Sequence, residues 1–151
     1  MTRQSRDRNR RHGRKRAPTE QPEVPNGKIP FMRIATLLNY ATDPSEAATQ
    51  ARDLEAAGVD MIWIPEAYGF DAVSLLGFLA ATTNTVGLGS GILNTYSRTP
   101  ATLAQTAAGL EALSGGRFTL GLGASGPQVI EGFHGVPYTM PLTRLSEIIE
   151  I

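Results

Sequence analysis

The chain has 151 residues, of which 41% are hydrophobic and 19% are charged, and this composition is typical of a single globular domain. The formal net charge is zero, but the charges are unevenly distributed: residues 1–16 contain eight Lys and Arg and one acid, Asp7, whereas residues 17–151 contain six bases and thirteen acids. Because the larger part is acidic, nucleic acid is not the expected main partner. The lack of cysteine excludes disulfides and thiolate metal sites, and no apolar run approaches the roughly 18 residues of a membrane span, so we expect a cytoplasmic protein.

Residues 1–28 form a basic tail that we expect to be disordered. They contain almost no apolar residues before Val24 and mix charge with Pro and Gly, so they cannot contribute to a hydrophobic core. The basic run at residues 10–16 suggests a contact with nucleic acid or another acidic surface, but a solvated extension is the simpler interpretation.

After the tail, strand and helix patterns alternate. Residues 31–38 predict a buried strand, and Asp43-Pro44-Ser45-Glu46 then starts a helix with an N-cap, a proline at the first helical position and an acid three residues after the cap. Residues 59–64 predict a second strand. Asp71 caps a second helix, whose expected buried face consists of Leu75, Leu76, Leu79 and Ala80.

The same alternation continues to residue 151. Residues 85–92 predict a third strand, Thr99-Pro100 begins a third helix that ends at Ser114-Gly115-Gly116, and residues 117–122 predict a fourth strand. Residues 142–151 begin another amphipathic helix. Helices of this length connect parallel strands, either in a barrel or in an open doubly wound sheet. An eight-stranded barrel takes about 250 residues, so we interpret the chain as half of an enzyme.

Residues that directly follow strands are the candidates for chemistry, because ligand sites in parallel α/β folds gather at the carboxyl ends of the strands. Glu66 follows the apolar run MIWIP, where desolvation favours an acid or base role. The alternative is a carboxylate that caps a helix or pairs with an arginine. Arg98 lies just before a helix start, where it either meets an anionic group or forms a structural salt bridge.

A glycine motif and a histidine follow the fourth strand. Gly121-Leu-Gly123-Ala-Ser-Gly126 matches G-x-G-x-x-G, but it lies on the fourth strand and precedes a short helix, so a nicotinamide-binding site is the weaker interpretation. His134 has no second His or Cys nearby, so we expect a loop hydrogen bond there and predict no metal site.

Three segments carry a family resemblance: SRTP at 97–100, LSGGRFTLGLGASGPQV at 113–129 and EGFHGVPY at 131–138. With them, residues 29–151 resemble the luciferase-like monooxygenase superfamily and, within it, oxidoreductases similar to methylenetetrahydromethanopterin reductase that depend on coenzyme F420. The resemblance implies an α/β fold, the N-terminal half of a (β/α)8 TIM barrel of which the chain supplies about four βα units.

The resemblance also implies a cofactor site. Relatives bind coenzyme F420, or FMN in other branches, at the carboxyl ends of the strands. The bulge with a non-proline cis peptide that presses on the cofactor ring corresponds to Gly91-Ile92. Glu66 corresponds to an acidic residue near the reacting ring, although Ala67 stands where some relatives have histidine. The loop along the cofactor corresponds to Ser125, Gly126, Pro127 and Gln128.

The implied activity is hydride transfer between coenzyme F420 and a small organic substrate, with Glu66 as the proton donor or acceptor. Two alternatives stay open at this point: an FMN-dependent monooxygenase, and a truncated, non-catalytic fragment of such an enzyme. Unpaired sheet edges invite self-association, so we expect a homo-oligomer.

Overall fold

A computed structural model describes residues 32–38 and 43–151 of the chain. The predicted tail at 1–28 lies outside these residues, as does the start of the first predicted strand. The described residues from Arg33 to Ile151 form one compact unit. None of the helices in this described part is both long and apolar enough to cross a membrane.

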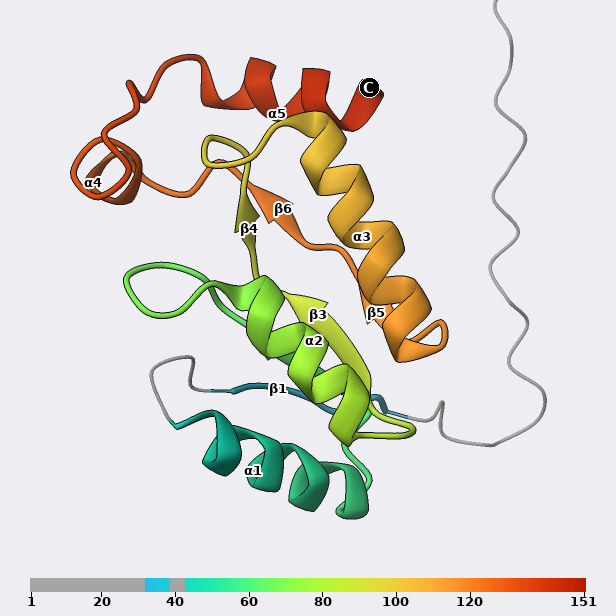
Figure 1. Cartoon of the computed structure of the whole chain (residues 1–151). Coiled ribbons are helices and arrows are strands. Elements are labelled where there is room, and N and C mark those ends of the chain that lie inside the picture. Colours follow the sequence, from blue (N-terminus) through green and yellow to red (C-terminus); the bar gives the residue numbers. More distant parts are fainter. Residues whose placement is uncertain (1–31, 39–42) are drawn as a thin grey trace, which may run out of the picture. The chain divides into compact units, whose positions relative to one another are not determined.

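Strands and helices alternate along the compact unit (Figure 1). The elements are β1 (Ala35–Leu37), α1 (Pro44–Ala56), β2 (Met61–Ile64), α2 (Ala72–Thr82), β3 (Gly87–Ser90), β4 (Leu93–Asn94), α3 (Pro100–Ser114), β5 (Phe118–Thr119), β6 (Leu122–Gly123), α4 (Pro127–Ile130) and α5 (Pro141–Glu150). The main sheet has four parallel strands in the order β1-β2-β3-β5, and β4 pairs with β6 in a second parallel pair.

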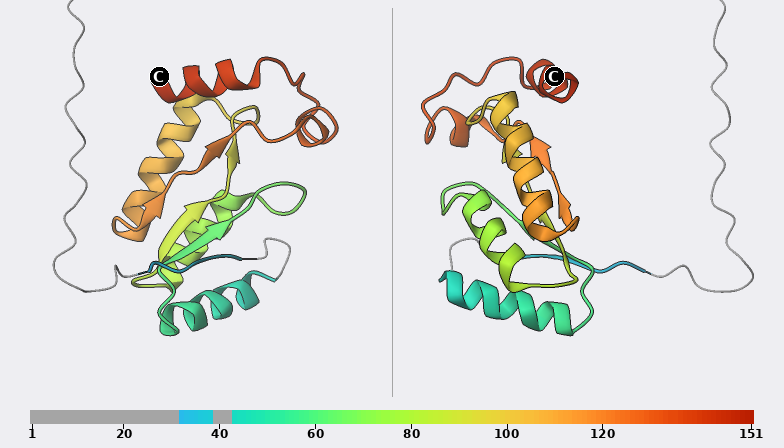
Figure 2. Two further views of the ribbon diagram at one scale, coloured as in Figure 1. Left: turned by 180° about the vertical axis from the view of Figure 1, so that it is seen from behind. Right: turned by 45° about the vertical axis from the view of Figure 1, so that its right-hand side comes forward.

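The strand order favours the barrel over the doubly wound sheet. Each successive strand adds to the same edge, whereas a doubly wound sheet reverses its order at a switch point. Helices α1, α2 and α3 follow one another along one side of the strands (Figure 2). Helix α4 after the glycine motif has only four residues, so the motif lacks the long helix of a dinucleotide fold.

The core lies between the sheet and the helices. Ile62, Ile64 and Leu88 are buried on the strands, and Leu76 and Leu79 are buried on α2. Alternate residues point to the other sheet face, where Leu37 lies in register with Trp63 and Gly89. Leu37 is 65% exposed, so this second face has little cover within the described part of the chain.

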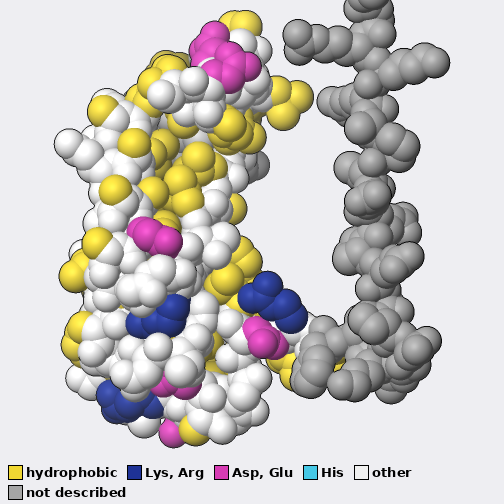
Figure 3. Space-filling view, turned by 90° about the vertical axis from the view of Figure 1, so that its right-hand side faces the viewer, with side chains coloured by type: hydrophobic (Ala, Val, Ile, Leu, Met, Phe, Trp, Pro, Cys, Tyr) yellow, Lys and Arg dark blue, Asp and Glu magenta, His cyan; other side chains and the backbone are white. Residues whose placement is uncertain are grey.

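Apolar side chains also gather on the face along α3 and the end of α5, in the upper part of Figure 3. Leu113 on α3 and Ile149 on α5 are among the exposed large hydrophobic residues. The amphipathic helix α5 buries none of its residues fully. Contiguous exposed apolar surface of this kind is typical of a packing or interaction surface.

The predicted helix boundaries are confirmed by their caps. Asp43 accepts a hydrogen bond from the Ser45 amide, Asp71 from the Ser74 amide and Thr99 from the Thr102 amide. At the other ends, Gly58 with φ of 84° follows α1 and Gly115 with φ of 65° ends α3. These left-handed conformations favour glycine.

The strands are shorter than predicted. The first is reduced to Ala35–Leu37 within the described residues and has exposed side chains, because it is the edge strand of a sheet with one uncovered face. The third predicted strand, 85–92, ends at Ser90, and a further strand, β4, follows the break at Gly91-Ile92 outside the predicted range. The fourth predicted strand is divided at Leu120-Gly121. Beside this second break, the Ser90 hydroxyl donates to the Gly121 carbonyl and accepts from its amide, and a Cβ on Gly121 would lie 2.0 Å from the Ser90 carbonyl oxygen.

The amino end of the sheet is held by two charged side chains bonded mainly to backbone. Glu55 accepts from the amides of Asn84, Thr85 and Val86. Burial raises the pKa of Glu55, but the hydrogen bonds outweigh it and lower the pKa from 4.5 to about 2. Arg117 donates to the carbonyls of Ala80, Thr83, Val86 and Ser114 and to the Thr83 hydroxyl.

Candidate active site

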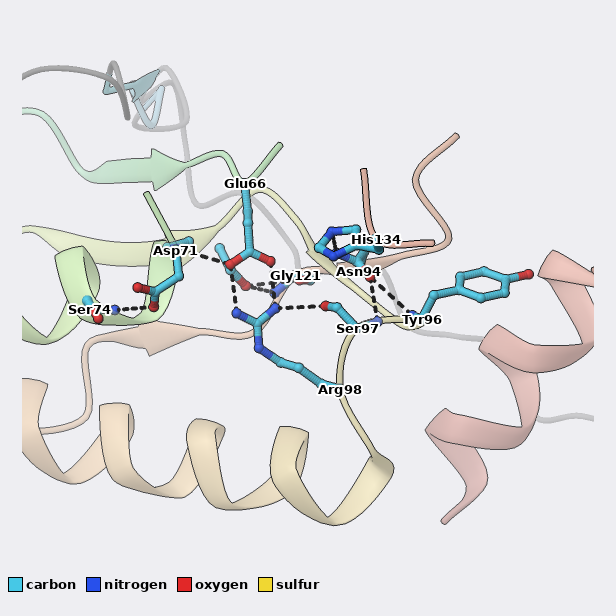
Figure 4. Close-up of polar contacts among 11 residues, drawn as sticks. Glu66, Asp71, Ser74, Asn94, Tyr96, Ser97, Arg98, Gly121 and His134 are labelled. Atoms are coloured by element: carbon cyan, nitrogen blue, oxygen red, sulfur yellow. Dashed lines mark hydrogen bonds and ion pairs between the residues drawn. The ribbon is translucent and has the colours of Figure 1, made fainter. Parts of the chain in front are cut away.

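The candidate site lies at the carboxyl ends of the strands, in the segments that follow β2, β4 and β6. Glu66 follows β2, Arg98 precedes α3, and His134 comes from the loop after α4 (Figure 4). Thirty-two residues separate Glu66 from Arg98 in the chain, and the parallel topology brings them together.

Glu66 is held by three hydrogen bonds. Its Oε1 accepts from the Ala72 amide at 3.0 Å and from Arg98 at 2.7 Å, and its Oε2 accepts from Arg98 at 2.5 Å. The Glu66 side chain is 9% exposed and that of Arg98 15%. The alternative to a catalytic role is a carboxylate that caps a helix or pairs with an arginine. Glu66 makes both of these contacts, because it bonds the amide of the first residue of α2 and pairs with Arg98. Its catalytic role stays a prediction.

The pair keeps Arg98 charged. Its hydrogen bonds to Glu66 raise the pKa of Arg98, against the opposing effect of burial, and Asp71 adds a favourable charge interaction. The fork of the guanidinium matches the two carboxylate oxygens, which fixes both side chains more firmly than a single contact would. Arg98 also donates to the Ser97 hydroxyl at 3.4 Å. The salt bridge predicted as one alternative for Arg98 is confirmed.

A pocket of about 210 Å³ opens beside this pair. It receives side chains and backbone from the β2–α2 connection, from the start of α3 and from the loop after α4. Its lining consists of Glu66, Ala67, Gly69, Phe70, Asp71, Ser97, Arg98, Phe133 and His134. Because charged, aromatic and imidazole groups from three separate segments meet there, the pocket is suited to hold a small molecule.

His134 faces Asn94 across the site. Its Nε2 lies 3.4 Å from the Asn94 amide nitrogen, and the Asn94 Oδ1 accepts from the backbone amides of Tyr96 and Ser97. The loop hydrogen bond expected for His134 is thus found. Sequence reasoning missed the aromatic part of the pocket, because Phe70 and Phe133 lie in loops where no periodic pattern marks them.

The residues predicted to bind the cofactor flank two paired parallel strands, one group before β4 and the other after β6. Gly91-Ile92 is a cis peptide directly before β4, as the family resemblance implied. Residues 125–128 follow β6, which pairs with β4. A Cβ on Gly123 of β6 would lie 3.2 Å from the Ile92 side chain, so Ile92 packs against the strand that leads into the loop at 125–128.

The loop after β6 has an accessible backbone. Ser125 has a φ of 57°, and its carbonyl accepts a hydrogen bond from the Tyr138 hydroxyl at 2.9 Å. Ser125, Pro127 and Gln128 are exposed and Gly126 is half-buried. A Cβ on Gly126 would meet only the Gln128 side-chain oxygen within 4 Å. These features fit a loop that lies along a ligand, and the cofactor role stays a prediction.

Comparison with known proteins decides the family. The family model described as luciferase-like monooxygenase matches residues 27–151, which is most of the chain. The chain belongs to the luciferase-like monooxygenase family. The resemblance drawn from the three sequence segments is thereby confirmed.

Similar proteins agree on the fold. Rv3520c of Mycobacterium tuberculosis, which carries the name of a coenzyme F420-dependent oxidoreductase, is 40% identical over 122 residues, covering 80% of this chain and 35% of its own. The coenzyme F420-dependent tetrahydromethanopterin reductase of Methanopyrus kandleri matches with a TM-score of 0.69 and 26% identity, over 78% of this chain and 38% of that one. An FMN complex of a type II Baeyer-Villiger monooxygenase from Pseudomonas putida shares the fold alone, with a TM-score of 0.68 and 19% identity over 79% and 37% of the two chains.

The chain matches only part of the length of each relative. It spans about 35% to 38% of the length of these relatives, and its parallel sheet matches part of their TIM-barrel fold. The four predicted βα units are therefore part of a (β/α)8 barrel, and the doubly wound alternative is wrong.

Proposed function

We propose that this chain forms the N-terminal part of an oxidoreductase that transfers hydride between coenzyme F420 and an organic substrate. One observation carries the proposal: the predicted cofactor residues come from two separate segments that flank the paired strands β4 and β6, with Gly91-Ile92 directly before β4 and residues 125–128 after β6. The 40% identity to a relative named for coenzyme F420 supports the choice of cofactor. FMN is the alternative cofactor.

The residues present fit a flat, ring-shaped cofactor. Gly126 carries no side chain, and a Cβ there would meet only the flexible end of Gln128, so the backbone of this loop is open to a ring or to a ligand tail. Gln128 and Ser125 supply exposed polar groups beside Gly126. When bound, the deazaflavin supplies the hydride chemistry, and these residues would hold and orient it.

Glu66 is the residue proposed to exchange a proton with the substrate. Its carboxylate lies at the pocket wall, and Arg98 fixes its orientation through two hydrogen bonds. The same contacts support a second role in which Glu66 only positions the loop before α2. A single substitution separates the two roles, because loss of a proton donor affects turnover and loss of a loop contact affects stability.

The proposal is tested first by titration of the purified 151-residue chain with coenzyme F420 and, separately, with FMN, following cofactor fluorescence. We expect saturable binding of coenzyme F420. Tighter binding of FMN would favour the monooxygenase. If neither cofactor binds, the proposal that this chain forms a complete cofactor site is overturned.

The second test is Glu66→Gln, placed in a form of the enzyme that turns over substrate. We expect turnover to fall about a hundredfold, because general acid–base catalysis contributes about 10²–10⁴ in rate, while cofactor affinity stays nearly unchanged. Glu111→Gln, on the exposed surface of α3, is the matched control. Unchanged turnover together with lower thermal stability would assign Glu66 to the positioning role.

A further inference from the structure

The pocket beside Glu66 has an aromatic part that hydride transfer does not by itself explain. Phe70 is 59% exposed and Phe133 54%, and both line the pocket. Tyr68 packs edge-on against Phe133, with ring centroids 5.6 Å apart, which holds that ring in place. Large aromatic side chains left in water at a concave site favour a ligand with apolar surface.

The size of the pocket limits the ligand. Its volume is about 210 Å³. An apolar cavity of about 150 Å³ is enough for benzene, so this pocket holds one ring with a small substituent. A ligand with two fused rings would have to extend into solvent.

His134 offers a directed hydrogen-bond donor. The Asn94 Oδ1 accepts from two backbone amides, so the amide nitrogen of Asn94 is the group that faces His134 Nε2 at 3.4 Å. This nitrogen is a donor, so His134 Nε2 is the acceptor and the neutral ring carries its hydrogen on Nδ1. Within the described part of the chain Nδ1 has no hydrogen-bond partner, so it is available to a ligand oxygen.

The charges around the pocket disfavour an anion. Glu66 and Asp71 carry two negative charges, and Arg98 carries one positive charge that is committed to Glu66. Asp71 in turn accepts a hydrogen bond from the Ser74 amide. The lining therefore has a net negative charge, and a carboxylate or phosphate would enter against it.

We propose that this pocket binds an uncharged single-ring compound with a carbonyl or hydroxyl oxygen, whose ring packs against Phe70 and Phe133 and whose oxygen accepts a hydrogen bond from His134 Nδ1. This inference rests on the proposed function, since it names the substrate class of that site. It gives His134, which the sequence predicts only as a loop hydrogen-bonder, a direct contact with substrate.

The test is an NMR titration that needs no cofactor. The chain has only two histidines, so the ring resonances of His134 are read with those of His12 as the internal reference. Three ligands of matched size are compared: cyclohexanone, cyclohexanecarboxylate and methylcyclohexane. We expect saturable shifts of His134 with cyclohexanone, and at least tenfold weaker binding of both the carboxylate and the hydrocarbon.

Variants locate the contact. His134→Phe should remove the preference of the pocket for the ketone over the hydrocarbon, and His134→Gln, which keeps a side-chain N–H, should restore part of it. Phe133→Leu should weaken the binding of all three ligands by a similar factor. Leu113→Ala, at an exposed position outside the pocket lining, should leave the affinity for each ligand unchanged.

Three results would overturn the proposal. They are carboxylate binding as tight as ketone binding, no saturable shift of His134 with any of the three ligands, and an unchanged ketone preference in His134→Phe. Failure of coenzyme F420 to bind leaves this titration intact, so failure of the substrate class and failure of the proposed function are distinguished.

Discussion

The two ends of the sheet use arginine differently. At the amino end, Arg117 donates five hydrogen bonds to protein oxygen atoms, and four of these atoms are backbone carbonyl oxygens. At the carboxyl end, Arg98 pairs with the side chain of Glu66 beside an open pocket. The first arrangement fixes helix ends and a strand start. The second leaves polar groups next to space that a ligand can enter. In barrels of this type stability resides at the amino ends of the strands and chemistry at the carboxyl ends.

The glutamates follow the same division. Glu55 accepts from three consecutive backbone amides, whereas Glu66 accepts from one amide and one arginine. The difference shows that a buried or bonded charge is not in itself a sign of function. Glu55 and Arg117 also line a cavity, of about 490 Å³, so a neighbouring space does not separate the two ends. What separates them is the partner of the charged group, which is mainly backbone at the amino end and another charged side chain at the carboxyl end.

The largest expected effect comes from Arg117→Met. Its loss leaves several carbonyls without their donor, so we expect the free energy of unfolding to fall by about 3 kcal/mol, measured by denaturant titration. Arg98→Met is the matched comparison and should cost less, about 1.5 kcal/mol, because Glu66 loses two hydrogen bonds but keeps the one from the Ala72 amide and lies at a pocket that water can enter. Equal losses from the two substitutions would contradict the division between the ends.

A smaller effect is expected from Glu55→Gln, and it depends on pH. Because the pKa of Glu55 is lowered to about 2 in the folded chain, its carboxylate stabilises the fold above pH 4.5, and this stabilisation is lost as pH falls from 4.5 towards 2. We expect a loss of about 1 kcal/mol at pH 7, allowing for solvent screening.

The measurement is the difference in unfolding free energy between wild type and Glu55→Gln across this pH range. The difference should shrink towards zero as pH approaches 2. Glu46→Gln, at an exposed position in the first turn of the same helix, is the matched control and should change the unfolding free energy at pH 7 by less. If the difference in unfolding free energy stays constant with pH, Glu55 does not contribute to the loss of stability at low pH.

The smallest effect is expected away from both ends, at Gly109 in α3. A Cβ there meets nothing within 4 Å, and glycine inside a helix costs about 0.5–1 kcal/mol relative to alanine. Gly109→Ala should therefore raise the unfolding free energy by about 0.5 kcal/mol in thermal denaturation. A loss of stability instead would show that this side of α3 packs closely against something.

The sequence predicted much of the fold because its signals are local. Asp43, Asp71 and Thr99 mark three helix starts, since a side-chain oxygen that satisfies a free amide works through residues two or three positions away. The family segments then led to the cis peptide at Gly91-Ile92. Strand ends were predicted less well, because they depend on neighbours such as Ser90, whose hydroxyl occupies both backbone groups of Gly121.

The sequence by itself determined the order of strands and helices, the caps and the family, because each of these depends on short-range spacing or on a contiguous motif. Only the tertiary structure decided that Glu66 and Arg98 form a pair, that Asn94 orients His134, and that Phe70 and Phe133 line one pocket. The two hydrogen-bonded pairs join residues 32 and 40 positions apart, and the two phenylalanines that share the pocket are 63 positions apart. These groups meet because parallel strands align their carboxyl ends, and no local pattern encodes that alignment.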